Sequence, residues 1–504
     1  MSAASATGRL GRLDPARLRG RLRVPGLVRR EPPLVVAVLG FAALYATYAV
    51  VNHRTHFGTN GWDLGIFDQT VWRYSTLQAP ANTVREMSNI LGDHFEPILV
   101  VLAPLYWVWS DATMLLIAQA VLVAVAMVPI FLYAQPRVGR LAAYGMAIAY
   151  ALFWGVAEGV STDFHEVAFA PLLIALVVLF ADRRQWTGFW ITVVLLLATK
   201  ESFAFVVAGL GLYLIVLKEV RRGLIALAAG VGWYLLVSYA LIPLFADDEG
   251  FRYWKDFEQL GTNPLDAAVN LVTHPGLVFH ELTDDPTKVR TLAYLFVPFG
   301  LLTLYSPLVL LTVPLILERM LADAPGRWGT DSYFSLSVAS ILVLGAADGL
   351  ARVLRSLDLE RAKRWIAPAA AGVMVAGGLV LFTRFPLSDV FRGGFYQSTR
   401  AERAYAGAIA AVPDDASVMA QDWFVPHLSA RDDVHLISPR APITDYIVAD
   451  IGNPARTPFP NPSIPDLQRV VQERRPGYEV VYERSFPEHG MPNDVIVLRR
   501  RGLR

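Results

Sequence analysis

Long apolar segments separated by short arginine-rich stretches are the feature that most limits how this chain can fold. The first segment, 33–51, is close to the roughly 20 residues that a helix needs to cross a bilayer. Hydrophobic residues make up 54% of the 504 residues and charged residues only 18%, whereas a soluble domain carries about 25% charge. So little charge cannot cover a soluble particle of this size. The sequence therefore predicts a multi-span membrane protein.

Net charge and cysteine content exclude several classes of protein. The formal net charge is +1, whereas a protein that binds nucleic acid carries a basic excess, so nucleic acid is not an expected partner. The chain has no cysteine, which excludes disulfides, thiolate metal sites and thiol catalysis. Sequence patterns of zinc proteases, P-loop proteins and serine hydrolases are also absent.

The apolar segments, taken in order, predict about eleven transmembrane helices. The predicted spans are 33–51, 112–134, 141–157, 167–181, 186–199, 202–217, 224–245, a hairpin over 289–317 that counts as two, 332–350 and 366–382. Most arginine clusters then fall on one side of the membrane, which the positive-inside rule assigns to the cytoplasm. We therefore expect a cytoplasmic N-terminus and an extracytoplasmic C-terminus in a multi-pass protein of the cell membrane.

Three regions follow from this division. Residues 1–32 form a basic cytoplasmic arm, 33–383 a multi-span domain with a large first outer loop at 52–111, and 384–504 a small extracytoplasmic α/β domain. Within the loop, 97–109 is apolar but short, which predicts a surface or re-entrant helix. The tail alternates strands and helices. Its predicted strands are 417–420, 434–437, 446–450, 479–483 and 494–499, its helices 401–411 and 464–474, and a proline-rich loop covers 454–465.

Ionisable residues gather on the outer side of the predicted membrane domain. They are Asp63 and Asp68 in GWDLGIFDQTVW, His94 in DHFEP, Asp163, His165 and Glu166 in STDFHE, and Lys200 and Glu201 in ATKES. Charge at the edge of a bilayer is costly and commonly marks a functional site. Each group also has a structural interpretation, because carboxylates of this spacing cap helices and a lysine can reach out to the interface. Their common side favours one shared polar site.

The residue types suggest roles within such a site. A carboxylate near an apolar edge can act as a general base. Asp63 and Asp68 are about 140° apart on a regular helix, so we expect one to be catalytic and the other a cap or supporting group. Asp68 is the predicted base, because Asp63 stands where an N-cap is expected. The residues predicted to bind substrate are His94, Asp163, His165, Glu166, Lys200, Glu201, Arg252 and Arg290, the cations holding a phosphate. Asp163, His165 and Glu166 also suit a divalent cation, Mg²⁺ or Mn²⁺.

Four sequence runs together resemble a known family. DLGIFDQTVW, DHFEPILVVLAPLY, TDFHEVAFAPLLIA and TKESFAFVVAGLGLYL resemble the bacterial membrane protein family of unknown function 2079 (DUF2079), over about residues 40–450. That family is similar in layout to the C-type (GT-C) glycosyltransferases, which use polyprenyl-phosphate sugars. The resemblance implies a GT-C-like all-α membrane domain. It also implies an acidic residue of the first outer loop, Asp63 or Asp68, as base or metal ligand, with Asp163 and Glu166 in a second loop. A histidine expected at 331–333 is replaced, since the chain there reads Asp-Ser-Tyr.

These observations predict a membrane glycosyltransferase that moves a sugar from a polyprenyl-phosphate donor to a cell-envelope acceptor at the outer face. One alternative is a transporter or flippase of a lipid or small solute, in which the same acids serve as an ion path. Another is a non-catalytic membrane assembly protein. A transferase keeps its charges at the outer interface, whereas a transporter needs them near the midplane of the bilayer.

Overall fold

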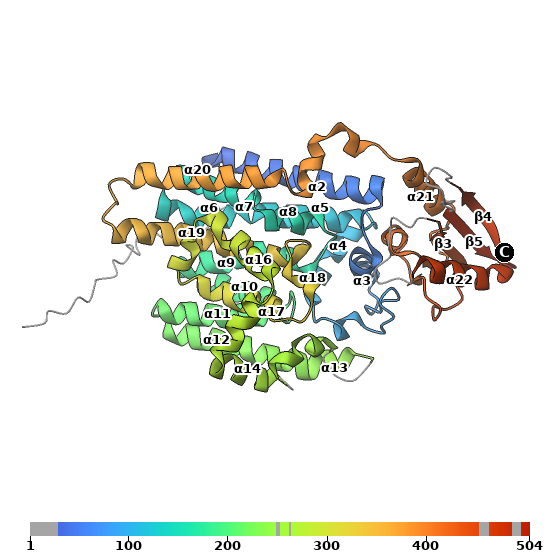
Figure 1. Ribbon diagram of the computed structural model, residues 1–504, viewed down its shortest axis with the longest axis horizontal. Helices are drawn as coiled ribbons and strands as arrows, with labels where there is room; N and C mark the ends of the chain where they lie inside the picture. Colours follow the sequence, from blue (N-terminus) through green and yellow to red (C-terminus); the bar gives the residue numbers. More distant parts are fainter. Residues whose placement is uncertain (1–28, 248–251, 262–263, 453–462, 486–494, 504) are drawn as a thin grey trace, which may run out of the picture.

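The molecule is a bundle of helices with a small sheet at one end (Figure 1). The computed structural model describes residues 29–247, 252–261, 264–452, 463–485 and 495–503. Nearly all of the basic arm 1–32 and most of the proline-rich loop 454–465 lie outside the described residues. We call the end of the bundle that carries the sheet the sheet end.

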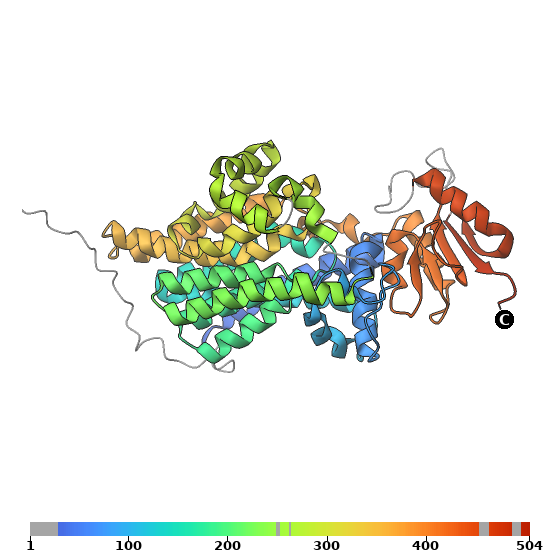
Figure 2. The same ribbon diagram turned by 90° about the horizontal axis from the view of Figure 1, so that it is seen from below.

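The bundle is built from helices of very different lengths. Its helices are α2 (Pro32–His56), α5 (Thr113–Val125), α6 (Met127–Val138), α7 (Arg140–Ala151), α8 (Trp154–Ser161), α9 (Ala170–Asp182), α10 (Trp186–Leu197), α11 (Phe203–Val216), α12 (Val220–Leu236), α13 (Ile242–Phe245), α14 (Pro264–Thr273), α15 (Pro275–Thr283), α16 (Pro286–Phe296), α17 (Val309–Met320), α18 (Pro325–Trp328), α19 (Leu336–Ser356) and α20 (Lys363–Phe382). Figure 2 shows the same bundle after a quarter turn, with α14 to α16 projecting from one side.

The predicted count of about eleven spans is too high for the described residues. Five helices are long and apolar enough to cross a membrane, or six if the bent pair α7 and α8 forms one span. The other apolar segments contain shorter helices. For example, the 13 residues of α9 rise only about 20 Å, less than the roughly 30 Å of a bilayer core. The predicted hairpin breaks at Gly300 and Leu301, which both have left-handed backbone angles.

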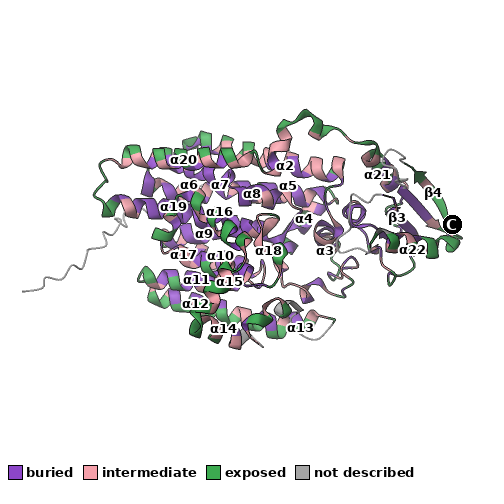
Figure 3. Ribbon diagram, viewed as in Figure 1, coloured by how far each residue is buried: buried purple, intermediate pink, exposed green. Residues whose placement is uncertain are grey.

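The centre of the bundle is α19. It packs against α6, α7 and α9, and its residues from Leu336 to Leu350 are all buried. Figure 3 shows this helix in purple, whereas α20 and α12 carry green, exposed residues on their outer faces. Apolar residues therefore face both the core and the surroundings of the bundle, as expected of helices in a membrane.

The segment between α2 and α5 holds several short elements at the sheet end. They are η2 (Gly61–Gly65), α3 (Ile66–Ser75), η3 (Ile90–Gly92), η4 (Pro97–Leu102) and α4 (Ala103–Tyr106). After α4, Trp107 and Val108 are 69% and 84% exposed. The segment 97–109 therefore forms only short helices, which are too short to span a membrane. Apolar side chains at its end are exposed on the surface of the molecule.

The tail forms a five-stranded mixed sheet in the order β2-β1-β3-β5-β4. The strands are β1 (Val418–Ala420), β2 (Val434–Leu436), β3 (Tyr446–Asp450), β4 (Tyr478–Arg484) and β5 (Val495–Arg500), and the helices are α21 (Arg400–Ala410) and α22 (Ile464–Arg474). β1 pairs in parallel with β2 and β3, and β5 is antiparallel to β3 and β4. The small sheet expected from the sequence is confirmed, with strands within one or two residues of the predicted ones.

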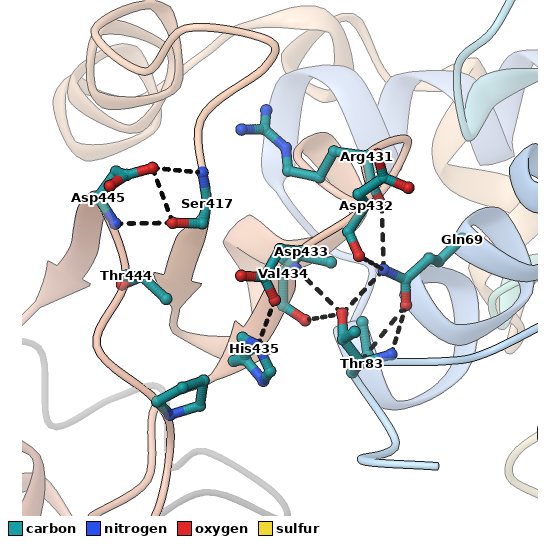
Figure 4. Close-up of polar contacts among 12 residues, drawn as sticks. Gln69, Thr83, Ser417, Arg431, Asp432, Asp433, Val434, His435, Thr444 and Asp445 are labelled. Atoms are coloured by element: carbon teal, nitrogen blue, oxygen red, sulfur yellow. Dashed lines mark hydrogen bonds and ion pairs between the residues drawn. The ribbon is translucent and has the colours of Figure 1, made fainter. Parts of the chain in front are cut away.

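The sheet domain contacts the segment between α2 and α5 directly. Figure 4 shows Gln69 and Thr83 facing residues 431–435 of the tail. Gln69 Nε2 donates to the Arg431 carbonyl at 3.1 Å. The Thr83 hydroxyl donates to the Val434 carbonyl at 2.6 Å and accepts from the Val434 amide at 3.0 Å. These contacts fix the tail on the part of the chain that carries Asp63 and Asp68.

Candidate functional site

The site is built around the turn that carries Asp63. Asn60 is the N-cap of η2, and its side-chain oxygen accepts from the Asp63 amide at 2.8 Å. Its Nδ2 donates to Asp63 Oδ2 at 3.1 Å. The turn is a single π-helical turn leading into α3, a rare feature that is frequent at functional sites. The cap is therefore Asn60, so the Asp63 side chain is available for another purpose.

Asp63 faces His165 across the site. Asp63 Oδ1 lies 3.3 Å from His165 Nε2, and the Asp63 side chain is 33% exposed while that of His165 is 3% exposed. The two atoms lie within ion-pair distance, but they do not form a hydrogen bond of good geometry. Burial alone would raise the pKa of Asp63, but His165, Asn60 and Lys200 outweigh burial and lower it. Asp63 is therefore an ionised carboxylate with access to solvent.

The His165 ring is held in one orientation. Its Nδ1 lies 3.0 Å from the Asp163 carbonyl oxygen, which can only accept, so Nδ1 carries a hydrogen. The Tyr333 ring stacks on the imidazole with centroids 3.6 Å apart, and Ser332 beside it has a left-handed φ of 71°. Backbone strain of this kind is often found at functional sites.

A second group of charges lies beside Asp63. Lys200 Nζ is 2.8 Å from Glu166 Oε1, and Glu166 is almost fully buried. His94 Nδ1 is 2.7 Å from Glu201 Oε1, and the Phe95 amide donates to Glu201 at 3.2 Å. The two pairs come from three separate segments of the chain, and Lys200 and Glu201 are consecutive.

Lys200 and Glu166 each stabilise the charged form of the other. Burial would raise the pKa of Glu166, but Lys200 and His165 lower it. Burial would likewise lower the pKa of Lys200, but Glu166 raises it well above its usual value. Glu166 is therefore ionised and Lys200 is a cation. Because Lys200 also lowers the pKa of Asp63, both groups of charges belong to one site.

Asp163 and Asp68 have supporting positions. Asp163 is buried and accepts from the Asn60 amide at 2.7 Å, and burial together with Asp63 raises its pKa well above normal. Asp68 is 1% exposed. Its two oxygens accept from the Tyr106 hydroxyl at 2.5 Å and the Ser429 hydroxyl at 2.6 Å.

Burial raises the pKa of Asp68 to about 7, partly offset by these two hydrogen bonds. Both Asp68 oxygens are thus occupied inside the contact with the tail. Asp68 was the predicted base because Asp63 was expected to be the N-cap. The N-cap is instead Asn60, so this reason for preferring Asp68 no longer holds.

Of the two predicted arginines, Arg290 is not brought to this site. Arg290 is exposed on α16 and makes no hydrogen bond or ion pair with the acidic residues of the site within the described chain. Arg252 begins η7 (Arg252–Leu260), but its side chain lies outside the described residues. Lys200 is the predicted cation that the structure does place beside an acidic residue of the site, Glu166.

A divalent cation does not fit the predicted ligands. Among the residues that the structure describes, no three His, Asp or Glu side chains are grouped to hold a metal ion. Glu166 is paired with Lys200, Asp163 with a backbone amide, and His165 with Asp63.

Three residues of the site were missed by sequence reasoning. Asn60 directly precedes GWDLGIFD, and asparagine is a preferred N-cap residue, so the sequence carried a signal for it. Tyr333 follows a strained serine and covers His165. Asp422 of the tail accepts from two amides of the Asp63 turn, and no local pattern marks that long-range contact.

The fold is similar to that of a solved bacterial protein, ArnT. ArnT from Cupriavidus metallidurans bound to undecaprenyl phosphate matches with a TM-score of 0.50 at 12% identity, over 93% of this chain and 98% of that chain. The apo state of ArnT gives 0.47 at 13% identity, with the same coverage. The apo oligosaccharyltransferase of Archaeoglobus fulgidus gives 0.41 at 12% identity, over 89% of this chain and 69% of that one. At such identity the likeness concerns the fold alone, and only the first match carries that argument.

The family is defined by sequence. A family model described as predicted membrane protein (DUF2079) matches residues 55–485, so the chain belongs to that family. The matched range includes Asn60, Asp63, His165 and Lys200. No curated protein matches the chain.

Proposed function

We propose that the protein is a membrane glycosyltransferase that moves a sugar from a polyprenyl-phosphate donor to an acceptor hydroxyl. The observation that carries the proposal is the partly exposed carboxylate of Asp63, close to His165, in the same site as Lys200, a cation whose charge helps lower the pKa of Asp63. A base and a phosphate-binding cation are the two groups that this reaction requires. The likeness of fold to ArnT bound to undecaprenyl phosphate adds support for a donor of this kind.

The proposed reaction uses the two groups in one displacement. The acceptor oxygen attacks the anomeric carbon while its proton moves to the Asp63 carboxylate. The bond between the anomeric carbon and the phosphate oxygen breaks, and its electron pair leaves with the polyprenyl phosphate. Lys200 has three N–H donors, of which Glu166 occupies one at 2.8 Å, so the others remain for the phosphate. A single displacement inverts the anomeric configuration.

A lipid analysis tests this function. In a strain that lacks the protein, a polyprenyl-phosphate sugar is expected to accumulate, and a glycosylated envelope component is expected to disappear. Wild-type protein restores the profile, and Asp63→Asn expressed at the same level does not. Mass spectrometry of lipid extracts provides the measurement. An unchanged profile contradicts the proposal. An accumulated lipid that a membrane-impermeant label reaches only in inside-out vesicles identifies a flippase instead.

The proposal requires the site and the tail to lie outside the cytoplasm. We expect an alkaline phosphatase fused after Arg504 to be active and a green fluorescent protein at the same position to be dark. The matched control fuses both reporters after Gly139, which directly follows the second apolar stretch long enough to cross a membrane, Thr113–Val138. There the pattern reverses. Fluorescence after Arg504 would contradict an outward tail.

A further inference from the structure

The first turn of the Asp63 helix is capped from outside its own segment. The first backbone amides of a helix have no partner within the helix. Here the Asn60 amide donates to Asp163, and the Asp63 amide donates to the Asn60 side chain. The two amides between them, of Gly61 and Trp62, donate to Asp422 Oδ1 at 2.9 Å and 3.3 Å. A carboxylate of the tail thus supplies half of this cap.

The surroundings of Asp422 suit it to this position. Its side chain is 7% exposed, and it begins η13 (Asp422–His427), the tail segment that packs against η2. A carboxylate at a helix N-terminus is stabilised by the helix dipole. Burial, with a smaller contribution from Asp63, raises the pKa of Asp422 to about 7, although the hydrogen bonds from the two amides act in the opposite direction.

Close packing fixes the same turn from the same side. A Cβ on Gly65 would lie 2.8 Å from Val425 Cγ1, and one on Gly61 would lie 2.7 Å from Val425 Cβ. Such distances are shorter than a side chain tolerates, so the glycines allow Val425 to lie directly on the turn. Val425 is itself fully buried. Hydrogen bonds and packing from one short tail segment therefore hold the backbone on which Asp63 stands.

We propose that Asp422 and Val425 are positioning residues for Asp63, so that the tail completes the active site rather than only resting on it. The expected loss of sugar transfer rests on the proposed function, whereas the fixed position of the Asp63 turn does not. Asp422 touches no reacting atom. It acts through the backbone of residues 61 and 62, which sets the direction of the Asp63 side chain toward His165.

Two replacements of Asp422 separate this role from simple stabilisation. Asp422→Asn keeps an oxygen that accepts from both amides, whereas Asp422→Ala removes it. We expect Asp422→Ala to lower kcat about 10²-fold, the usual cost of a displacement of about 1 Å, with KM for the donor unchanged because Lys200 is untouched. Asp422→Asn should retain activity within a few-fold. The matched control is Asp445→Ala, which removes a carboxylate that accepts from the Ser417 amide and hydroxyl inside the tail (Figure 4).

Packing offers an independent test with built-in rescue. Gly65→Ala is expected to lower activity because its Cβ meets Val425 Cγ1. Val425→Ala removes that carbon, and the next atom of the residue then lies 3.7 Å from the new Cβ, an ordinary contact. The double variant should therefore be more active than Gly65→Ala alone. Equal activity of the two would overturn the part assigned to Val425.

Amide hydrogen exchange of the full-length protein in detergent reads the geometry without any substrate. Asp422→Ala should speed exchange of the Gly61 and Trp62 amides about tenfold, the effect of one lost hydrogen bond, while Asp422→Asn and Asp445→Ala should not. Unchanged exchange in Asp422→Ala overturns the inference. Faster exchange with no sugar transfer even in the wild type supports the positioning role and contradicts the proposed function instead.

Discussion

Replacement of Asp63 by asparagine is expected to lower the rate of sugar transfer by about 10²–10⁴, the usual contribution of a general base. Asparagine has the same size and can still accept from Asn60, so the turn should keep its shape. It cannot take a proton from the acceptor. The rate is measured as consumption of a labelled polyprenyl-phosphate sugar by membranes that contain equal amounts of each variant.

Asp68→Asn is the matched control, since it makes the same chemical change five residues later. Asp68 lies between the hydroxyls of Tyr106 and Ser429, and asparagine retains an oxygen for one of them. We expect activity within a few-fold of the wild type. An inactive Asp68→Asn beside an active Asp63→Asn would reverse the assignment of the base. Full activity of both variants would remove the main support for a transferase.

Sequence reasoning identified the segments of the site because their charges are out of place in an apolar chain. GWDLGIFD, STDFHE and TKES stand out against their surroundings, and the structure brings Asp63, His165 and Lys200 into one neighbourhood. The physical reason is general. Charges at the edge of a membrane domain lower their free energy by pairing with one another, so segments that carry them tend to meet.

The roles within the site were harder to predict, because they depend on backbone detail. The comparison of Asp63 with Asp68 assumed a regular helix that begins at Asp63. The N-cap is instead Asn60, and the first turn after it is π-helical. The angle of about 140° between Asp63 and Asp68, which holds for a regular α-helix, therefore does not apply. Asp422 lies about 360 residues away from the amides that it accepts, and no periodicity encodes such a contact.

The span count failed for a related reason. Hydropathy records how apolar a segment is, but not whether its helix continues. Over 289–317 the residues are apolar, yet the helix stops near Gly300 and resumes only at Val309 as α17. A break in the backbone needs only one or two residues in left-handed conformation, which average hydropathy cannot detect.

The buried pair of Lys200 and Glu166 gives the second large effect. Lys200→Gln leaves the Glu166 carboxylate buried without its counter-charge, which typically costs about 3–5 kcal/mol of stability. The double variant Lys200→Gln/Glu166→Gln replaces both charges by amides of similar length, so most of that stability should return. Thermal unfolding of the purified proteins in detergent measures this recovery.

Binding of the lipid separates a phosphate site from a structural ion pair. If Lys200 holds the donor phosphate, the stable double variant should bind undecaprenyl phosphate at least tenfold more weakly than the wild type, since a charge-assisted hydrogen bond contributes about 1.5–3 kcal/mol. Native mass spectrometry with undecaprenyl phosphate, and with undecaprenol as the uncharged reference, reads the difference.

The control for this comparison is Arg137→Gln/Asp182→Asn, which neutralises a buried ion pair of 2.5 Å between α6 and α9. This pair lies at the end of the bundle away from Glu166, because α9 leads from Glu166 toward Asp182. Its loss changes the electrostatics of the bundle without touching the site, so binding of undecaprenyl phosphate should persist. Wild-type binding by the Lys200→Gln/Glu166→Gln variant would instead mean that Lys200 serves only to neutralise Glu166, and the donor phosphate would have to be held by another cation.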